Sequence, residues 1–106
     1  MISSMYGPNE ATQEGSGTGL GISVTYRKNG KVCSVYGTGT LTGALTANST
    51  VVYTLPAGYR PPGNVVTPDF QNTNGSVRIL SDGKIQSRVA RTSGNKLLFF
   101  VTYVME

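Results

Sequence analysis

The chain contains no histidine and no tryptophan, and Cys33 is the one cysteine among its 106 residues. A cysteine nucleophile needs a neighbouring base, most often histidine, so this chain lacks the partner that such catalysis uses. A lone cysteine also forms no disulfide within the chain. We therefore expect Cys33 to be a small buried apolar residue.

Acidic residues are almost as scarce. The five are Glu10, Glu14, Asp69, Asp82 and Glu106. Two lie in the polar N-terminal segment and one is the last residue, so Asp69 and Asp82 are the only pair that could act together as catalytic carboxylates. Asp82 already suits a turn. Because no cluster of His, Cys, Asp or Glu has the spacing of metal ligands either, we expect no enzyme activity, no metal and no other cofactor.

Long apolar runs are missing as well. The longest, residues 97–101, is far shorter than the ~20 residues that a membrane-spanning helix needs. Residues 1–19 lack the basic start and the apolar centre of a signal peptide. We expect no membrane insertion, and any release from the cell would use another route, such as lysis.

Charge is low and mixed in sign. Nine Lys and Arg residues against five Asp and Glu residues give a net charge of +4, and the cations are scattered along the sequence. The strongest argument for a nucleic-acid surface would be a strand face shared by Arg78, Arg88 and Arg91. Because so few residues are charged, we expect no nucleic-acid partner.

The residues that are abundant, Gly, Ser, Thr and Asn, divide the chain into two parts. Residues 1–19 are rich in Gly and Ser and show no periodicity, so we interpret them as a linker or the end of a stalk. Residues 20–106 form the expected domain. From Leu20 to Tyr26 apolar and polar residues alternate, which predicts a half-buried strand.

Asn29-Gly30 is a strong signal for a two-residue hairpin turn, which would pair Tyr26 with Cys33 and Val24 with Val35. The second strand would then reach about residue 36. The glycines that follow it predict bulges, or a bend that moves the chain between sheets; these are Gly37, Gly39 and Gly43.

Further strands are predicted at residues 50–55, 64–67, 76–80, 84–89 and 96–104, with a turn at 92–95. Pro68 restricts strand 64–67 to a sheet edge. Between 76–80 and 84–89, a three-residue loop with a left-handed Gly83 pairs Ile79 with Ile85 and keeps the apolar residues on one face.

The last predicted strand, 96–104, is apolar on both faces. Such a strand is either central in a sandwich or covers a contact between subunits, and we favour the subunit contact. No segment shows helical periodicity. The expected fold is all-β, a compact antiparallel barrel or sandwich of about six to eight strands.

Residues 55–62 contain three prolines, which fix the backbone in a stiff corner between two strands. Rigid loops on a β scaffold often carry binding contacts. A sugar-binding site combines an aromatic ring with Asn, Asp or Arg side chains that bond to hydroxyls. We select five candidate ligand-binding residues on this basis: Tyr59, Arg60, Asn64, Asp69 and Asn72.

Each of three candidates has an alternative structural role. Tyr59 would pack into the sandwich as a plug for the corner, Arg60 would be a solvated charge, and Asp69 would cap a turn. These alternatives stay open at the level of sequence.

Three segments together resemble a known family of domains. They are residues 54–66, Thr-Leu-Pro-Ala-Gly-Tyr-Arg-Pro-Pro-Gly-Asn-Val-Val, then Gly75-Ser76-Val77-Arg78-Ile79, and then Asp82-Gly83-Lys84-Ile85. The pattern resembles the C-terminal head domain of phage tail and baseplate receptor-binding proteins, closest to those of lactococcal siphophages. It covers residues 20–104. The same corner occurs in many phage tail proteins, so it marks the type of domain better than the ligand.

The resemblance implies a homotrimer of antiparallel β barrels on a stalk, located at the tail tip or baseplate of the virion. It implies host adhesion through a cell-wall saccharide without catalysis, and the net positive charge would favour a phosphate-bearing glycan. Some lactococcal heads use Trp and His at the sugar site, which this chain lacks, so no binding residue is carried over. The alternative function is a structural trimerisation module of a tail fibre or baseplate.

Overall fold

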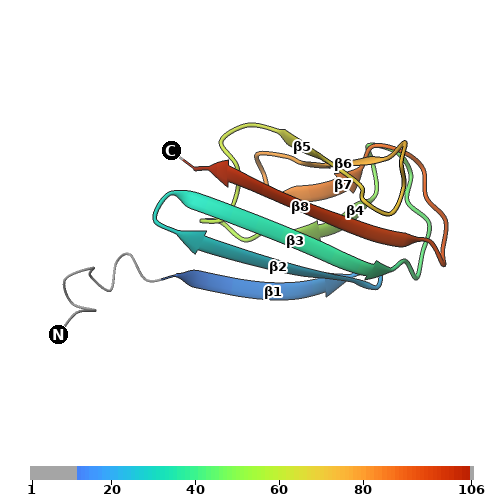
Figure 1. Cartoon of the computed structure of the whole chain (residues 1–106), viewed down its shortest axis with the longest axis horizontal. Coiled ribbons are helices and arrows are strands. Elements are labelled where there is room, and N and C mark those ends of the chain that lie inside the picture. The colour runs from blue at the N-terminus through green and yellow to red at the C-terminus, as the bar shows by residue number, and fades with distance from the viewer. Residues whose placement is uncertain (1–11, 106) are drawn as a thin grey trace.

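The computed structural model describes residues 12–105, which form eight strands in two antiparallel sheets (Figure 1). The described part of the chain contains no helix. The expected all-β class and number of strands are therefore confirmed. The two sheets form a sandwich and do not close into a barrel.

Each sheet has four strands. In spatial order, the first sheet consists of β1 (Gln13–Gly19), β2 (Ile22–Asn29), β3 (Val32–Thr40) and β8 (Lys96–Val104). The second consists of β4 (Val51–Thr54), β7 (Lys84–Ser87), β6 (Ser76–Ile79) and β5 (Val65–Pro68). The chain changes sheets after β3, and β5 lies at an edge, as Pro68 predicted.

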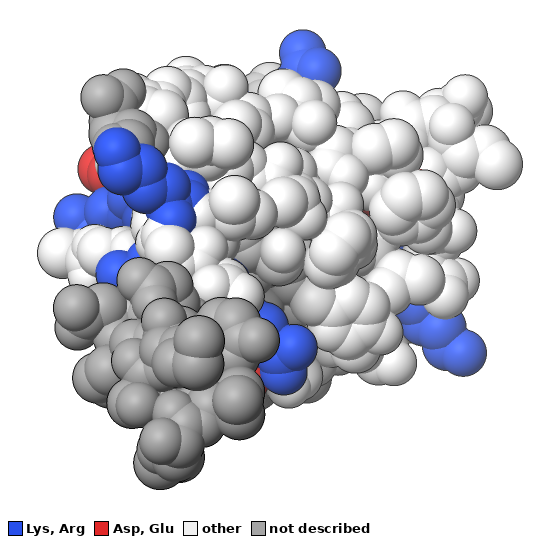
Figure 2. Space-filling view, turned by 60° about the vertical axis from the view of Figure 1, so that its left-hand side comes forward, with Lys and Arg blue, Asp and Glu red and all other residues white. Residues whose placement is uncertain are grey.

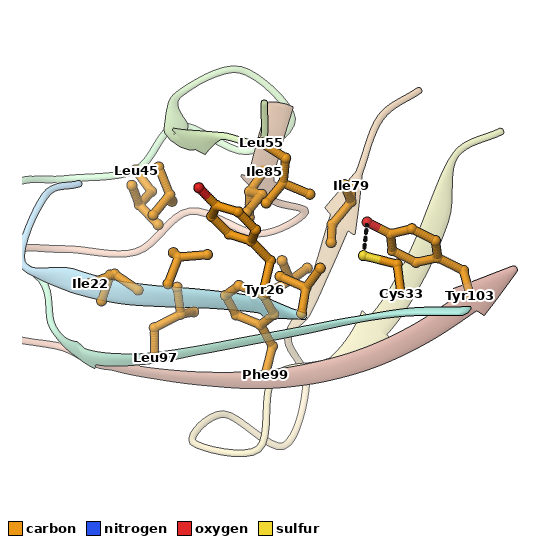
Figure 3. Packing of buried hydrophobic residues seen from close by; sticks show 14 of the residues in the cluster. Ile22, Tyr26, Cys33, Leu45, Leu55, Ile79, Ile85, Leu97, Phe99 and Tyr103 are labelled. Carbon is orange, nitrogen blue, oxygen red and sulfur yellow. Dashed lines mark hydrogen bonds between the residues drawn. The ribbon is translucent and has the colours of Figure 1, made fainter. Parts of the chain in front are cut away.

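The core lies between the two sheets, where alternate residues of each strand point inward (Figure 3). On β2 the inward residues Ile22, Val24 and Tyr26 are buried while their neighbours are exposed. Phe99 of β8 is the largest fully buried side chain. Burying such side chains stabilises the fold by roughly 1.5–3 kcal/mol each.

Two local predictions agree with the structure in detail. The β6–β7 register pairs Val77 with Ser87 and Ile79 with Ile85, as the three-residue loop requires. Gly83 has φ 92°, the left-handed conformation that this loop needs. The turn at residues 92–95 is also present, with the Asn95 amide donating to the Thr92 carbonyl.

The predicted register of the β2–β3 hairpin is wrong by two residues, because the turn lies one residue later in the chain than predicted. The structure pairs Asn29 with Val32 and Tyr26 with Val35, so Gly30 and Lys31 form the turn. Of these two, only Gly30 has a positive φ, 63°, which is the pattern of a type II′ turn. Because this shift is an even number of residues and side chains alternate with a period of two, every side chain keeps its predicted face. Strand β3 also continues beyond residue 36, to Thr40.

The linker predicted for residues 1–19 is wrong for residues 13–19, which form β1 and pair with β2 along seven residues. Residues 1–11 lie outside the described part. The glycines of β1 alternate with Ser16 and Thr18, and they occupy the inward positions. A Cβ on Gly17 would overlap the Tyr53 ring, and one on Gly19 would overlap the Val52 carbonyl oxygen. The strand therefore needs glycine to pack this closely on the core.

Strand β8 lies at the edge of its sheet, so the alternative of a central last strand is wrong. Its inner face is buried through Leu97, Phe99 and Tyr103. Its outer face is open, with Phe100 51% and Val104 61% exposed. The expected subunit contact on this face stays a prediction.

The free edge of β8 is partly covered by the end of β5. The Thr67 hydroxyl donates to the Phe100 carbonyl over 2.8 Å, and the Phe70 amide donates to the Leu98 carbonyl over 2.8 Å. The Leu98 amide donates to the Asp69 carboxylate over 3.3 Å. These bonds join the two sheets and satisfy backbone groups that an open edge would leave unpaired.

A buried ion pair fixes the loop that provides this cover. The carboxylate of Asp69 pairs with the guanidinium of Arg91, and both side chains are almost fully buried. The second carboxylate oxygen accepts the amides of Gln71 and Leu98. Arg91 also donates to the Lys96 carbonyl over 2.5 Å. The pair therefore ties the β5–β6 loop to the segment that leads into β8.

We expect Gly19→Ala to lower the free energy of unfolding by about 2 kcal/mol, because the added methyl meets backbone that cannot move aside. Chemical denaturation measures this change. Ser16→Ala, on the exposed face of the same strand, should change stability by less than ~0.5 kcal/mol. Equal stability of the two variants would contradict the packing of β1 on the core.

We expect Asp69→Asn to cost about 3 kcal/mol of stability, because it leaves the buried Arg91 charge without its counterion. The matched control is Asp82→Asn, which breaks an exposed pair with Lys84 and should cost less than ~1 kcal/mol. Thermal and urea unfolding of both variants provide the comparison. A loss at Asp69 no larger than at Asp82 would show that the buried pair does not stabilise the fold.

Candidate binding site

The outer face of the first sheet carries a surface hollow of about 330 Å³. Its lining residues come from three adjacent strands, and they are Thr25 and Arg27 of β2, Ser34 and Tyr36 of β3, and Phe100 of β8. They share one face because they alternate with core residues on each strand. The core therefore determines which side chains form the hollow.

The strand register places these residues in two neighbouring rows. Thr25 lies opposite Tyr36, and Tyr36 lies opposite Phe100. Arg27 lies opposite Ser34 in the next row. Directly opposed residues have Cβ atoms about 4.5–5.5 Å apart, so the two aromatic side chains stand beside each other. Tyr36 is 43% exposed and Phe100 is 51% exposed, which leaves both rings accessible.

Two polar residues of the hollow, Ser34 and Arg27, bond to outward side chains beside it in the second row. The hydroxyls of Ser34 and Thr102 are 3.0 Å apart. The Arg27 guanidinium donates from Nε and Nη2 to one carboxylate oxygen of Glu14 on β1, over 3.3 and 3.1 Å. The ion pair is exposed on both sides. The hollow therefore combines two rings, several hydroxyls and a guanidinium whose charge is neutralised locally.

Such a surface can bind a ligand that has both apolar and hydroxylated faces. Aromatic rings cover C–H surfaces, and serine, threonine and arginine side chains exchange hydrogen bonds with hydroxyls. The β2, β3 and β8 strands hold these groups on a rigid scaffold. The chemistry fits recognition of a saccharide.

The structure places Tyr59, the first predicted site residue, against the core. Its ring contacts Tyr26 edge to face, with 4.6 Å between centroids, and the Lys28 ammonium lies 5.1 Å from its centroid. Its carbonyl accepts the Tyr103 hydroxyl and lies 3.5 Å from the Cys33 sulfur. Tyr59 thus has the role of a plug for the proline corner, and its contact with a ligand stays a prediction.

Arg60 and Asn64 also make contacts within the fold. Arg60 donates from Nε to the Leu55 carbonyl over 2.8 Å, inside the proline corner. The Asn64 side-chain oxygen accepts the Ser81 amide over 3.2 Å. The Leu55 amide donates to the Gly83 carbonyl. Asn64 therefore helps to join the corner to the β6–β7 loop, and Arg60 braces the corner itself.

The five predicted residues do not form one cluster, because β5 separates them. Asn64 precedes this strand and Asp69 follows it, which places them roughly 17 Å apart at ~3.3 Å per residue. Asp69 is held in the buried ion pair. The Asn72 side chain accepts the Asn74 amide over 3.4 Å within the loop. Whether these residues contact a ligand stays a prediction.

Cys33 is fully buried, as predicted. Figure 3 shows its thiol beside the hydroxyl of Tyr103, at 3.6 Å. Burial raises the pKa of the Cys33 thiol, and it raises the pKa of the Tyr103 hydroxyl well above its usual value. Both groups therefore stay protonated at neutral pH and serve the packing beneath the corner.

The charges are distributed unevenly. Figure 2 shows several Lys and Arg side chains together at the left of this view and others at the top, in the middle and at the lower right, with a large uncharged area between them. Each acid within residues 12–105 forms an ion pair; these are Glu14, Asp69 and Asp82. The basic face imagined for Arg78, Arg88 and Arg91 does not form, because Arg91 is buried against Asp69.

Sequence reasoning missed the residues of the hollow. Tyr36 and Phe100 each stood at an outward strand position, and the second apolar face of residues 96–104 was a visible signal. Their association depends on the β3–β8 register, which joins segments about sixty residues apart. No local pattern specifies that register.

Comparison with protein-family models gives no match, and comparison with curated proteins gives no significant match. Within residues 12–105, no group of three or more His, Cys, Asp or Glu side chains is arranged to hold a metal ion. The same residues include no helix long and apolar enough to cross a membrane.

Proposed function

We propose that this chain is the head domain of a phage receptor-binding protein, which attaches the virion to a saccharide of the host cell wall without catalysis. The observation that carries the proposal is the exposed pair of rings, Tyr36 and Phe100, beside the hydroxyl and guanidinium groups of Ser34 and Arg27. The resemblance of the proline corner and the β6–β7 segment to phage head domains supports the same function.

The arrangement of the hollow favours binding by a preformed surface. Its residues lie on β2, β3 and β8, which are eight or nine residues long and paired along their length. Binding of a ligand to this face therefore loses little free energy to ordering of the protein. A single shallow site of this kind binds weakly, and several heads on one virion would raise the overall affinity through avidity.

We expect Tyr36→Ala and Phe100→Ala each to weaken adsorption to host cell walls about tenfold, equivalent to ~1.4 kcal/mol, because each removes a ring that covers the sugar. A pull-down with purified cell walls measures adsorption. The control is Val66→Ala, a similarly exposed apolar position on the second sheet. Normal adsorption of both aromatic variants, with loss in Arg60→Ala, would move the site to the proline corner.

A structural trimerisation module is the second candidate, and the same face of the first sheet favours it. Val32 lies opposite Val104 at the far end of this face from Phe100, and both valines are exposed. The exposed valine pair at this end of β3 and β8 could be covered by another copy of the chain. This candidate and attachment are compatible if assembly uses the valine end and recognition uses the hollow.

We expect Val104→Asp to convert a trimer into monomers, because it places a charge in the proposed contact while leaving the core unchanged. Size-exclusion chromatography with light scattering measures the mass. Thr54→Asp, an exposed position on the second sheet, should leave the mass as in the unmodified protein. If Val104→Asp also leaves it unchanged, the valine end makes no subunit contact.

A further inference from the structure

We infer that the hollow selects an uncharged saccharide, and that the ion pair of Glu14 with Arg27 sets this selectivity. The inference rests on the proposed function, because it names the class of ligand for the same site. It differs from the expectation drawn from net charge, which favoured a phosphate-bearing glycan.

Among residues 12–105, Arg27 is the one charged residue that lines the hollow. A free guanidinium beside two aromatic rings would attract carboxylate or phosphate groups, often through two parallel N–H donors. In this structure Nε and Nη2 of Arg27 already donate to the Glu14 carboxylate. That side of the guanidinium is therefore occupied, and a ligand anion near the rest of it would be repelled by Glu14.

The position of Glu14 follows from the register of β1. Glu14 lies directly opposite Arg27 on the neighbouring strand, so the two side chains share the outer face. Their side chains are 58% and 64% exposed, and such a pair adds little to stability. Its main effect is on the local electrostatic potential, which it brings close to neutral.

Lys28, the next cation along β2, does not line the hollow. Lys28 follows Arg27 but points to the opposite side of the sheet, where its ammonium lies over the Tyr59 ring. The net charge of +4 therefore gives no information about this face. The other groups that line the hollow are two hydroxyl side chains and two rings.

These features match the chemistry of a neutral sugar. The rings can cover the C–H face of a pyranose, and the hydroxyls of Thr25 and Ser34 can exchange hydrogen bonds with the sugar hydroxyls. The Nη1 group of Arg27 makes no bond to Glu14 and can donate to a sugar oxygen. A volume of about 330 Å³ lies at the small end for ligand sites, which fits a short stretch of a polysaccharide.

The test uses an array of neutral hexose and N-acetylhexosamine oligosaccharides beside the same sugars carrying phosphate or carboxylate. We expect the unmodified protein to bind neutral members at least tenfold better than their charged counterparts. Glu14→Gln keeps the size of the side chain but leaves Arg27 unpaired. This variant should bind the charged members at least threefold more tightly than the unmodified protein does, and added salt should reduce that gain.

Asp82→Asn is the matched control, because it removes the same single charge from an exposed pair on the β6–β7 loop. It should leave the selectivity unchanged. Circular dichroism of each variant verifies that the sheet is intact.

Two results would overturn the inference while leaving attachment in place: a preference of the unmodified protein for charged sugars, or equal shifts in Glu14→Gln and Asp82→Asn. The proposed function fails separately, if no saccharide binds and if Tyr36→Ala leaves adsorption to cell walls unchanged.

Discussion

The pairing of β3 with β8 is the constraint on which the rest of the structure depends. It joins nine residue pairs across about sixty residues of sequence, and it is the longest strand pairing in the first sheet. On the inner face it brings Phe99 over Gly37, where a larger residue would overlap the ring. On the outer face it sets Tyr36 beside Phe100. One register therefore builds the core and the candidate site together.

Backbone hydrogen-bonding groups at the edges of the two sheets are satisfied or limited in different ways. The β8 edge is covered by the segment after β5, which the ion pair of Asp69 with Arg91 holds in place. Pro68 ends β5, which is the edge strand of the other sheet, and proline is tolerated there because an edge strand does not need every backbone amide for pairing. Strand β1 contributes glycines to the core side, and its Glu14 pairs with Arg27 at the hollow. An edge strand with little apolar surface thus still affects both the packing of the core and the charge beside the candidate site.

Local signals in the sequence predicted much of the fold. Alternation identified most strands, and Gly83 specified the β6–β7 register because only one loop length kept Ile79 and Ile85 on the same face. The β2–β3 turn was misplaced because Asn29-Gly30 fits two primed turns, and the chain uses the one with Gly30 first. Strand β1 was missed because glycine carries no hydropathy signal, although its alternation with Ser16 and Thr18 was visible.

The candidate site was less accessible to sequence reasoning. Tyr59, Arg60 and Asp69 have side chains suited to recognition, but each found a partner inside the fold that only the tertiary structure could reveal. Tyr36, Arg27 and Phe100 come from three strands and meet through pairings between distant segments. Exposure and proximity are properties of the assembled sheet. Residue type alone therefore could not show that the second set of residues, and not the first, is exposed and close together.

The position of β1 also has a mechanical consequence. Gln13 pairs with Lys28 near one end of the molecule, and the strand runs from there along the edge of the sheet that carries the hollow. If the proposed ligand is held on β3 and β8, a pull directed outward from that end runs parallel to the strand. It loads all seven β1–β2 pairs in shear, so they must break together instead of unzipping one at a time. Under the proposed attachment function, a glycine strand that adds little to the core is thereby placed where it would bear tension.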